Sequence, residues 1–168
     1  MYIGGVSVYT KINRRKENSI MEKTMTADSE IIAKLYKNVK MGADSITKLL
    51  PKVTDGEFKT KLTDQLKGYE EYASKAKALL CNRGEPAREE NPMTKFWSGV
   101  GIAMNTMIDA SSSHISEMMI EGSTMGITDT TRIINEYENK PECDEAVGLA
   151  RDIVKFEQKN IEIMKSFL

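Results

Sequence analysis

The single histidine and three glutamates at helical spacing are the residues of this sequence that could do chemistry. His114, Glu117 and Glu121 follow one another at steps of three and four, which places them within two turns of one helical face. Glu157 and Asn160 have the same spacing nearer the C-terminus and could face them across a helical bundle. Carboxylate and imidazole donors suit a mononuclear iron or manganese site, so His114, Glu117, Glu121 and Glu157 are the predicted metal ligands and iron or manganese the possible cofactor.

A polar layer inside the fold is the alternative interpretation of the same residues. His114 would then be hydrogen-bonded to Ser111 or to a carboxylate, and Glu121, near the end of its helix, would reach water. An isolated buried carboxylate is costly, so Glu121 needs a partner or solvent in either case. The sequence leaves both interpretations open.

Several other chemistries are excluded by composition and spacing. One histidine cannot supply a His-rich zinc site, a facial triad or an HExxH motif. Cys81 and Cys143 lie too far apart for a CxxC redox pair, and two cysteines make no disulfide framework. With 24 basic and 25 acidic side chains the chain has no overall cationic field, so nucleic acid is not a predicted partner.

The elements that must position these residues are all helical from Asp28 onward. A first helix ends at Pro51, and Thr54 to Glu57 has the spacing of a capping box that opens a second helix. Apolar residues at steps of three and four mark the inner faces. The first inner face consists of Ile32, Leu35, Val39, Gly42, Ile46 and Leu49, and the second of Phe58, Leu62, Leu66, Tyr69, Tyr72, Ala76 and Leu79.

A long third helix is predicted to begin at Asn91-Pro92, after a break at Gly84 and Pro86, and to run to about Gly122. Its predicted inner face consists of Trp97, Val100, Met104, Met107, Ser111, His114, Met118 and Glu121. Thr128 and Asp129 are predicted to cap a short helix through Tyr137, which Pro141 ends. A last helix is predicted from about Asp144 to the C-terminus, on Val147, Ala150, Ile153, Phe156, Asn160, Ile163 or Met164, and Phe167.

The predicted fold class is therefore all-α, with four long helices and a short extra helix between the third and the fourth. Each long helix would measure about 36 to 45 Å. Residues 28–168 form a single bundle domain in this interpretation. The topology stays open between up-down-up-down and a crossover between the second and third helices. A crossover would put Cys81 and Cys143 at the same end of the bundle.

This layout of four amphipathic helices resembles the ferritin-like superfamily. The segment from Ser112 to Asp129, with His114, Glu117 and Glu121, also resembles small bacterial proteins of that superfamily with degenerate metal ligands. The resemblance covers residues 28–168 and implies a ferritin-like four-helix bundle.

The resemblance also implies where a di-iron centre would lie. Di-iron members place one Glu on each of two helices and a Glu-x-x-His on each of the other two. Here the middle of the first helix offers only Asp44, off its inner face, and the inner face of the second carries Gln65 and Tyr69. The fourth helix has Glu157 followed by Asn160, with an amide where the imidazole would be. A complete di-iron centre is therefore not expected, and the predicted function is that of a non-enzymatic bundle that self-associates or binds a partner. The alternative is a metal-binding protein or oxidoreductase with a reduced ligand set.

Methionines on the third helix suggest a second contact surface. Met118 and Met119 point about 100° apart, which favours packing over chelation of a copper ion. With Ile108 and Ile115 they widen the apolar side of this helix, so a homodimer through the third helix is predicted.

The N-terminus differs from the rest of the chain. Residues 1–27 hold five basic and two acidic side chains, which leaves 19 and 23 for residues 28–168. These first residues are predicted to be a solvated basic leader, with Met21 or Met25 as a possible true start. They do not have the order of a signal peptide, and no apolar run is long enough to span a membrane, so a cytoplasmic location and no membrane partner are predicted.

Overall fold

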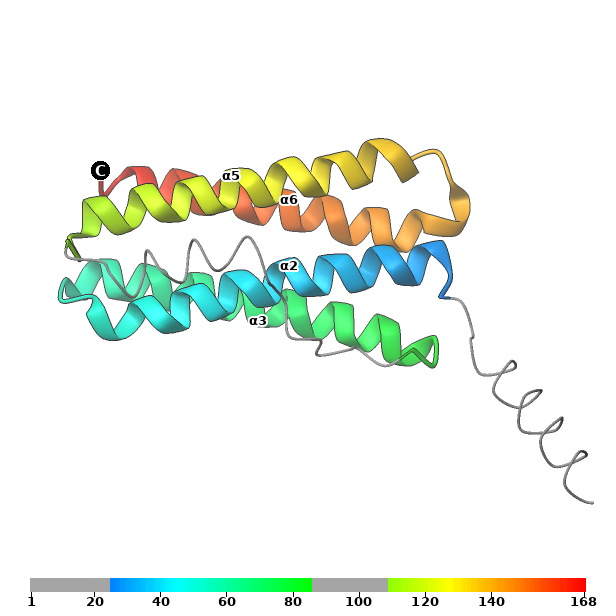
Figure 1. Cartoon of the computed structure of the whole chain (residues 1–168), viewed down its shortest axis with the longest axis horizontal. Helices are drawn as coiled ribbons and strands as arrows, with labels where there is room; N and C mark the ends of the chain where they lie inside the picture. Colours follow the sequence, from blue (N-terminus) through cyan, green and yellow to red (C-terminus); the bar gives the residue numbers. More distant parts are fainter. Residues whose placement is uncertain (1–24, 86–108) are drawn as a thin grey trace, which may run out of the picture.

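A computed structural model of the chain describes residues 25–85 and 109–168, which form an all-helical bundle (Figure 1). The four long helices are α2 (Ala27–Leu49), α3 (Gly56–Asn82), α5 (Ser112–Tyr137) and α6 (Asp144–Lys165). Two short 3-10 turns, Leu50–Lys52 and Pro141–Cys143, precede α3 and α6. These two ranges contain no strand, so the all-α prediction is confirmed.

The first two helices begin at polar side chains that cap them. Thr26 accepts a hydrogen bond from the backbone N–H of Ser29 at 3.2 Å, so α2 begins one residue before the predicted Asp28. Asp55 accepts from the N–H of Phe58 at 2.8 Å. The predicted capping box at Thr54 is therefore wrong by one residue, because the Asp55 carboxylate takes the role of N-cap.

The third helix differs most from its prediction. Ser111 has extended backbone angles, φ −61° and ψ 151°, and its hydroxyl accepts from the N–H of His114 at 3.3 Å. Because Ser111 is the N-cap of α5, a helix begins at this position. The prediction of one unbroken helix running through it to Gly122 is therefore wrong. The predicted start at Asn91-Pro92 lies outside the described residues.

The short extra helix predicted from Thr128 to Tyr137 is also wrong, because these residues continue α5. The Thr128 hydroxyl donates to the carbonyl of Thr124 at 2.9 Å, and Asp129 pairs with Arg132 at 2.9 Å on the helix surface. Both side chains are therefore occupied within an unbroken helix and cap nothing. Only the turn Pro141–Cys143 lies between α5 and α6.

Contacts between helix ends fix the directions of the helices. Arg83, just after α3, forms salt bridges to Asp28 at the start of α2 and to Glu145 at the start of α6. At the other end the ring of Phe58 lies 4.9 Å from that of Phe167, centroid to centroid. Helix α3 is thus antiparallel to α2 and to α6.

Helix α5 runs in the same direction as α3, because a short turn joins its end to the start of α6 (Figure 1). The end of α3 and the start of α5 therefore lie at opposite ends of the bundle. Cys81 and Cys143 accordingly lie at the same end, which is the arrangement expected for a crossover topology.

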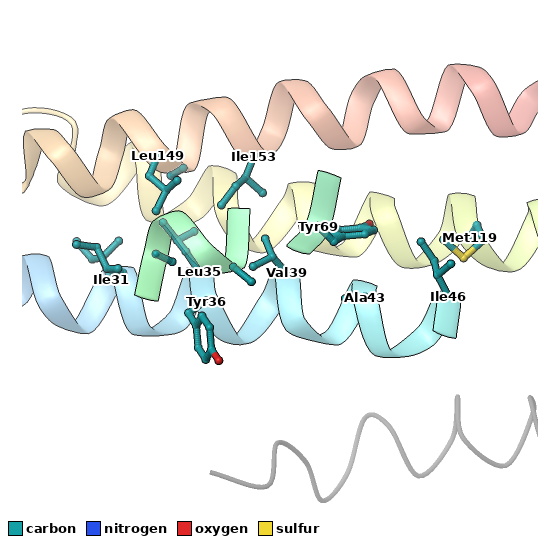
Figure 2. Packing of buried hydrophobic residues seen from close by; sticks show 14 of the residues in the cluster. Ile31, Leu35, Tyr36, Val39, Ala43, Ile46, Tyr69, Met119, Leu149 and Ile153 are labelled. Atoms are coloured by element: carbon teal, nitrogen blue, oxygen red, sulfur yellow. The ribbon is translucent and has the colours of Figure 1, made fainter. Parts of the chain in front are cut away.

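The core lies between the α2–α3 pair and the α5–α6 pair, and its large apolar side chains follow the predicted faces of three helices (Figure 2). Figure 2 shows Val39, Ile46 and Tyr69 in the space enclosed by the helices. The predicted residues that are fully or nearly fully buried are Ile32, Leu35, Val39, Ile46, Leu49, Phe58, Leu62, Tyr69, Ala76, Val147, Ala150, Ile153, Asn160 and Met164.

The inner face of α5 is not the predicted one. Its buried residues are Ile115, Ser116, Met119, Ser123 and Thr130. Three of them, Ser116, Ser123 and Thr130, recur every seven residues, which keeps small hydroxyl side chains on one face. The predicted face of Ser111, His114, Met118 and Glu121 is half-buried or exposed, and the remaining predicted members lie outside the described residues.

A glycine in α2 makes room for the ring of Tyr69. A Cβ atom built at Gly42 would lie 2.5 Å from that ring, and Tyr69 is only 3% exposed. Glycine is costly in a helix interior, so its presence here reflects the close approach of the ring.

We therefore expect Gly42→Ala to destabilise the fold by about 1–3 kcal/mol, because the ring cannot move away without overpacking its neighbours. Gly148→Ala in α6 is the matched control, since a Cβ there meets nothing within 4 Å. That variant should gain up to about 1 kcal/mol from helix propensity. Thermal unfolding of both variants checks this, and equal gains in stability would contradict the close packing of Tyr69 on α2.

Candidate functional site

The centre of the bundle holds a buried carboxylate, Glu157, bonded by side chains from two other helices. The Tyr69 hydroxyl of α3 donates to both Glu157 oxygens, Oε1 and Oε2, at 2.8 Å. The Ser123 hydroxyl of α5 donates to Oε2 at 2.7 Å. Glu157 is 6% exposed, so these bonds replace the water that a surface carboxylate would have.

The ring of Tyr69 is held on two sides, which fixes the direction of its hydroxyl. It lies against Gly42 of α2, as described above, and the ring of Phe156 meets it edge-on at 5.0 Å between centroids. Phe156 also contacts Tyr72 at 5.2 Å. The phenol that donates to Glu157 is therefore set in place by α2, α3 and α6 together.

Both acidic groups of this pair are shifted toward their protonated forms. Burial raises the pKa of Glu157, and the hydrogen bonds from Ser123 and Tyr69 offset part of that rise. Burial and the nearby Glu157 charge raise the pKa of Tyr69 well above its usual value. Tyr69 therefore remains a hydrogen-bond donor at neutral pH, and its phenolate is not available as a base.

A second set of buried polar atoms belongs to Gln65, Ser116 and Asn160. The amide nitrogen and oxygen of Gln65, the hydroxyl of Ser116 and the amide nitrogen of Asn160 have no hydrogen-bond partner within the described part of the chain. Gln65 and Asn160 are each one helical turn from a member of the Tyr69–Glu157 pair. These atoms extend the polar interior beyond the carboxylate itself.

The predicted metal ligands are divided between the surface and the interior. His114 lies in the first turn of α5 with 42% of its side chain exposed, and its Nδ1 is 3.7 Å from Oε2 of Glu117. Glu117 and Glu121 are exposed, whereas Glu157 is buried. The structure thus pairs His114 with Glu117 and does not bring these side chains together with Glu157.

No group of three or more His, Cys, Asp or Glu side chains that could hold a metal ion occurs within residues 25–85 and 109–168. The alternative prediction puts His114 in a buried polar layer, whereas the structure leaves its side chain partly exposed beside Glu117. The buried carboxylate at the centre is Glu157, whose hydrogen bonds come from Tyr69 and Ser123. Ser111 contacts His114 as a helix cap: its hydroxyl accepts a hydrogen bond from the backbone N–H of His114.

Ser123 is the functional-site residue that sequence reasoning missed. The sequence predicts Tyr69 on an inner face and Glu157 as a residue that could face the other candidate ligands, but a serine has no apolar signal that marks it as buried. The seven-residue recurrence of Ser116, Ser123 and Thr130 is the signal that identifies this face.

The raised pKa of Glu157 predicts a pH dependence of stability. The folded chain binds the proton more tightly than the unfolded chain, so the contribution of Glu157 is most favourable at acid pH. This stabilising contribution is lost as the pH rises from the ordinary pKa of a carboxyl group through the raised pKa of Glu157. Glu157→Gln has no such group, and its melting temperature relative to that of the natural chain should rise with pH between about pH 4 and 8.

The control for this comparison is Glu162→Gln on the exposed side of α6, where the carboxylate pairs with Lys165 at 2.7 Å. Its difference from the natural chain should change little over the same range. A constant difference between Glu157→Gln and the natural chain across the range would contradict a carboxyl group titrating in the interior.

No helix in the described part of the chain is long and apolar enough to cross a membrane. Comparison of the chain with protein-family models, with curated proteins and with solved structures finds no match. Two features of the bundle bear on its function: the Tyr69–Glu157–Ser123 bonds in its interior and the outer face of α5.

Proposed function

We propose that this protein is a non-enzymatic, ferritin-like four-helix bundle that acts by pairing with a second copy of itself through the outer face of α5. The observation that carries the proposal is Met125, a large apolar side chain that is 45% exposed on this helix. Within the described residues, only Leu168 at the end of the chain is another large hydrophobic residue in the exposed class.

The outer face of α5 offers a shape into which a second helix can pack. Met118 and Met125 lie seven residues apart and therefore on the same side of the helix. Gly122 lies between them along the helix and has no side chain, and a Cβ there would meet nothing within 4 Å. Flexible methionine side chains adapt well to such contacts.

The sequence expected Ile108, Ile115 and Met119 to widen the apolar side of this helix. Ile115 and Met119 are buried in the core, and Ile108 lies outside the described residues. The proposed contact therefore depends on Met118 and Met125.

The interior supports a role without catalysis. Glu157 is the buried acid at the middle of the bundle, and its oxygens already accept hydrogen bonds from Tyr69 and Ser123. A general base needs a free oxygen close to a substrate, and a nucleophile needs a base beside it. Here the carboxylate is engaged by its own chain.

The ferritin-like assignment is supported by the directions of the four helices. The parallel arrangement of α3 and α5, with the end of α3 and the start of α5 at opposite ends of the bundle, is that of ferritin-like bundles that have one long connection. Gln65 and Tyr69 of α3, and Glu157 and Asn160 of α6, lie on the inner faces where the resemblance implies metal ligands.

The alternative from the sequence, a protein that binds iron or manganese, does not fit the donors in the interior. One carboxylate, two primary amides, a phenol and two serines supply a single negative charge and no imidazole. The two iron ions of a ferritin-like centre need several anionic oxygens. His114 and Glu117 form a separate exposed pair, which leaves the predicted four-ligand set incomplete.

The self-association proposal predicts that the natural chain is a dimer at micromolar concentration and that Met125→Lys is a monomer. A buried ammonium group in an apolar contact carries a desolvation cost that the dimer cannot offset. Sedimentation velocity measures both. Leu168→Lys is the matched control, because it also removes an exposed apolar side chain but at the C-terminal end, and it should stay dimeric. A monomeric natural chain would rule the proposal out.

For metal, we expect the chain purified without a chelator or histidine tag to contain much less than one equivalent of iron or manganese. Added Fe²⁺ or Mn²⁺ should bind no better to the natural chain than to His114→Ala or Glu157→Gln. Elemental analysis and titration calorimetry test this. Stoichiometric binding that either substitution abolishes would favour the metal-binding alternative.

A further inference from the structure

Three deeply buried side chains beside the Tyr69–Glu157 pair carry polar atoms without protein partners. Gln65 is 4% exposed, Asn160 is 4% exposed and Ser116 is fully buried. Both polar atoms of the Gln65 amide, the Asn160 amide nitrogen and the Ser116 hydroxyl lack a hydrogen-bond partner among the described residues. A buried polar group left unpaired costs about 1–3 kcal/mol, so these side chains need a ligand.

The three side chains lie on the same side of the Tyr69–Glu157 pair. Gln65 comes four residues before Tyr69 on α3, and Asn160 comes three residues after Glu157 on α6. Because α3 and α6 are antiparallel, both displacements point the same way along the bundle, by about 6 Å and 4.5 Å. Gln65 and Asn160 are therefore at nearly the same level.

Ser116 extends this polar region in the same direction. It lies seven residues before Ser123, the α5 residue that donates to Glu157, and α5 runs parallel to α3. The displacement is about 10 Å toward the same end of the bundle. The three unpaired groups therefore come from three helices and belong to one end of the polar interior.

Gln65 also lies beside the Tyr69 phenol. Burial, followed by the charge and the hydrogen bond of Glu157, raises the pKa of Tyr69, and the nearby side chains of Ser123 and then Gln65 lower it. The Gln65 amide is therefore continuous with the Tyr69–Glu157–Ser123 bonds. Asn160, at nearly the same level on α6, continues the polar interior from the Glu157 side.

The chemistry of the unpaired atoms identifies the class of ligand. The amide nitrogens of Gln65 and Asn160 are donors, the Gln65 oxygen is an acceptor and the Ser116 hydroxyl is both. A metal ion interacts only with lone pairs and would be repelled by the two NH2 groups. Water both donates and accepts, and buried waters in proteins typically make about three such bonds.

We propose that Gln65, Asn160 and Ser116 form an internal water-binding site that joins α3, α5 and α6 next to Glu157. Bound water supplies the donors and acceptors that the protein lacks there, and it extends the hydrogen bonds of the Tyr69–Glu157 pair toward the end of the bundle where α5 begins. The site does not depend on the self-association proposed above, because its residues face the interior.

A double-mutant cycle on Gln65→Met and Asn160→Leu tests the proposal. Both substitutions keep the approximate volume and remove the polar atoms. If a shared water joins the two amides, each single substitution leaves the other amide and the water short of a partner and lowers the melting temperature by about 2–4 °C. The double substitution should cost clearly less than the sum.

Two results of the cycle would overturn the proposal. If each substitution raises the melting temperature, the amides have no partner in the natural chain, and replacing them with apolar side chains stabilises the fold. If the two effects are additive, no ligand joins the two residues. Gln158→Met, at an exposed position of α6, is the control and should change the melting temperature by less than about 1 °C.

Water itself is detected in the full-length natural chain by nuclear magnetic resonance. The side-chain NH2 of Gln65 should show a cross-relaxation peak at the water frequency that Asn160→Leu removes, whereas the exposed Gln158 should show none. Coupling between Gln65 and Asn160 without such a peak would indicate a direct bond and overturn the proposal. A loss of the peak on treatment with a chelator would do the same, because a cation would then be the ligand.

Discussion

The hydrogen bond from Tyr69 to Glu157 is the constraint around which the bundle is arranged. A carboxylate in the interior must receive donors, and Tyr69 supplies one from the opposite helix pair, 88 positions away in sequence. The ring can reach Glu157 only because α2 has a glycine, Gly42, where it passes. Ser123 of α5 completes the set. One buried charge thus imposes a requirement on each of the other three helices.

The ends of the bundle reinforce the relation that this bond sets between the two helix pairs. Asp28 bonds Arg83 and also accepts from the backbone N–H of Ala146 at 3.2 Å, so a single acid ties the start of α2 to the end of α3 and the start of α6. The Asp28 carboxylate lies at the first turn of α6, where it also interacts favourably with the positive end of the dipole of α6. With the Phe58–Phe167 contact at the other end, the helix pairs are joined at both ends and in the middle.

Helices α2, α3 and α6 were predictable because large apolar residues recur on their buried faces. Helix α5 was not, because its buried face includes the small polar residues Ser116, Ser123 and Thr130, while Met118 is only partly buried and Met125 is exposed. A rule that places methionines inside and hydroxyl side chains outside therefore selects the wrong face of α5. The cap at Ser111 had no distinguishing signal either, since three serines stand together and tertiary packing decides which one begins the helix.

The role of Glu157 shows why a site cannot be inferred from one helix. The sequence predicts only that Glu157 could face the other candidate ligands, since the predicted inner face of the last helix passes through Phe156 and Asn160, and the structure buries it. Whether such an acid binds a metal or accepts hydrogen bonds depends on the residues at the same level of the other helices. A metal ion needs further anionic oxygens or imidazoles, whereas a lone carboxylate needs only donors. Here α2 contributes a glycine, α3 a phenol and an amide, and α5 a serine. The neighbours supply donors and no second charge, and that is the physical reason for taking the centre of this bundle as a hydrogen-bonded layer.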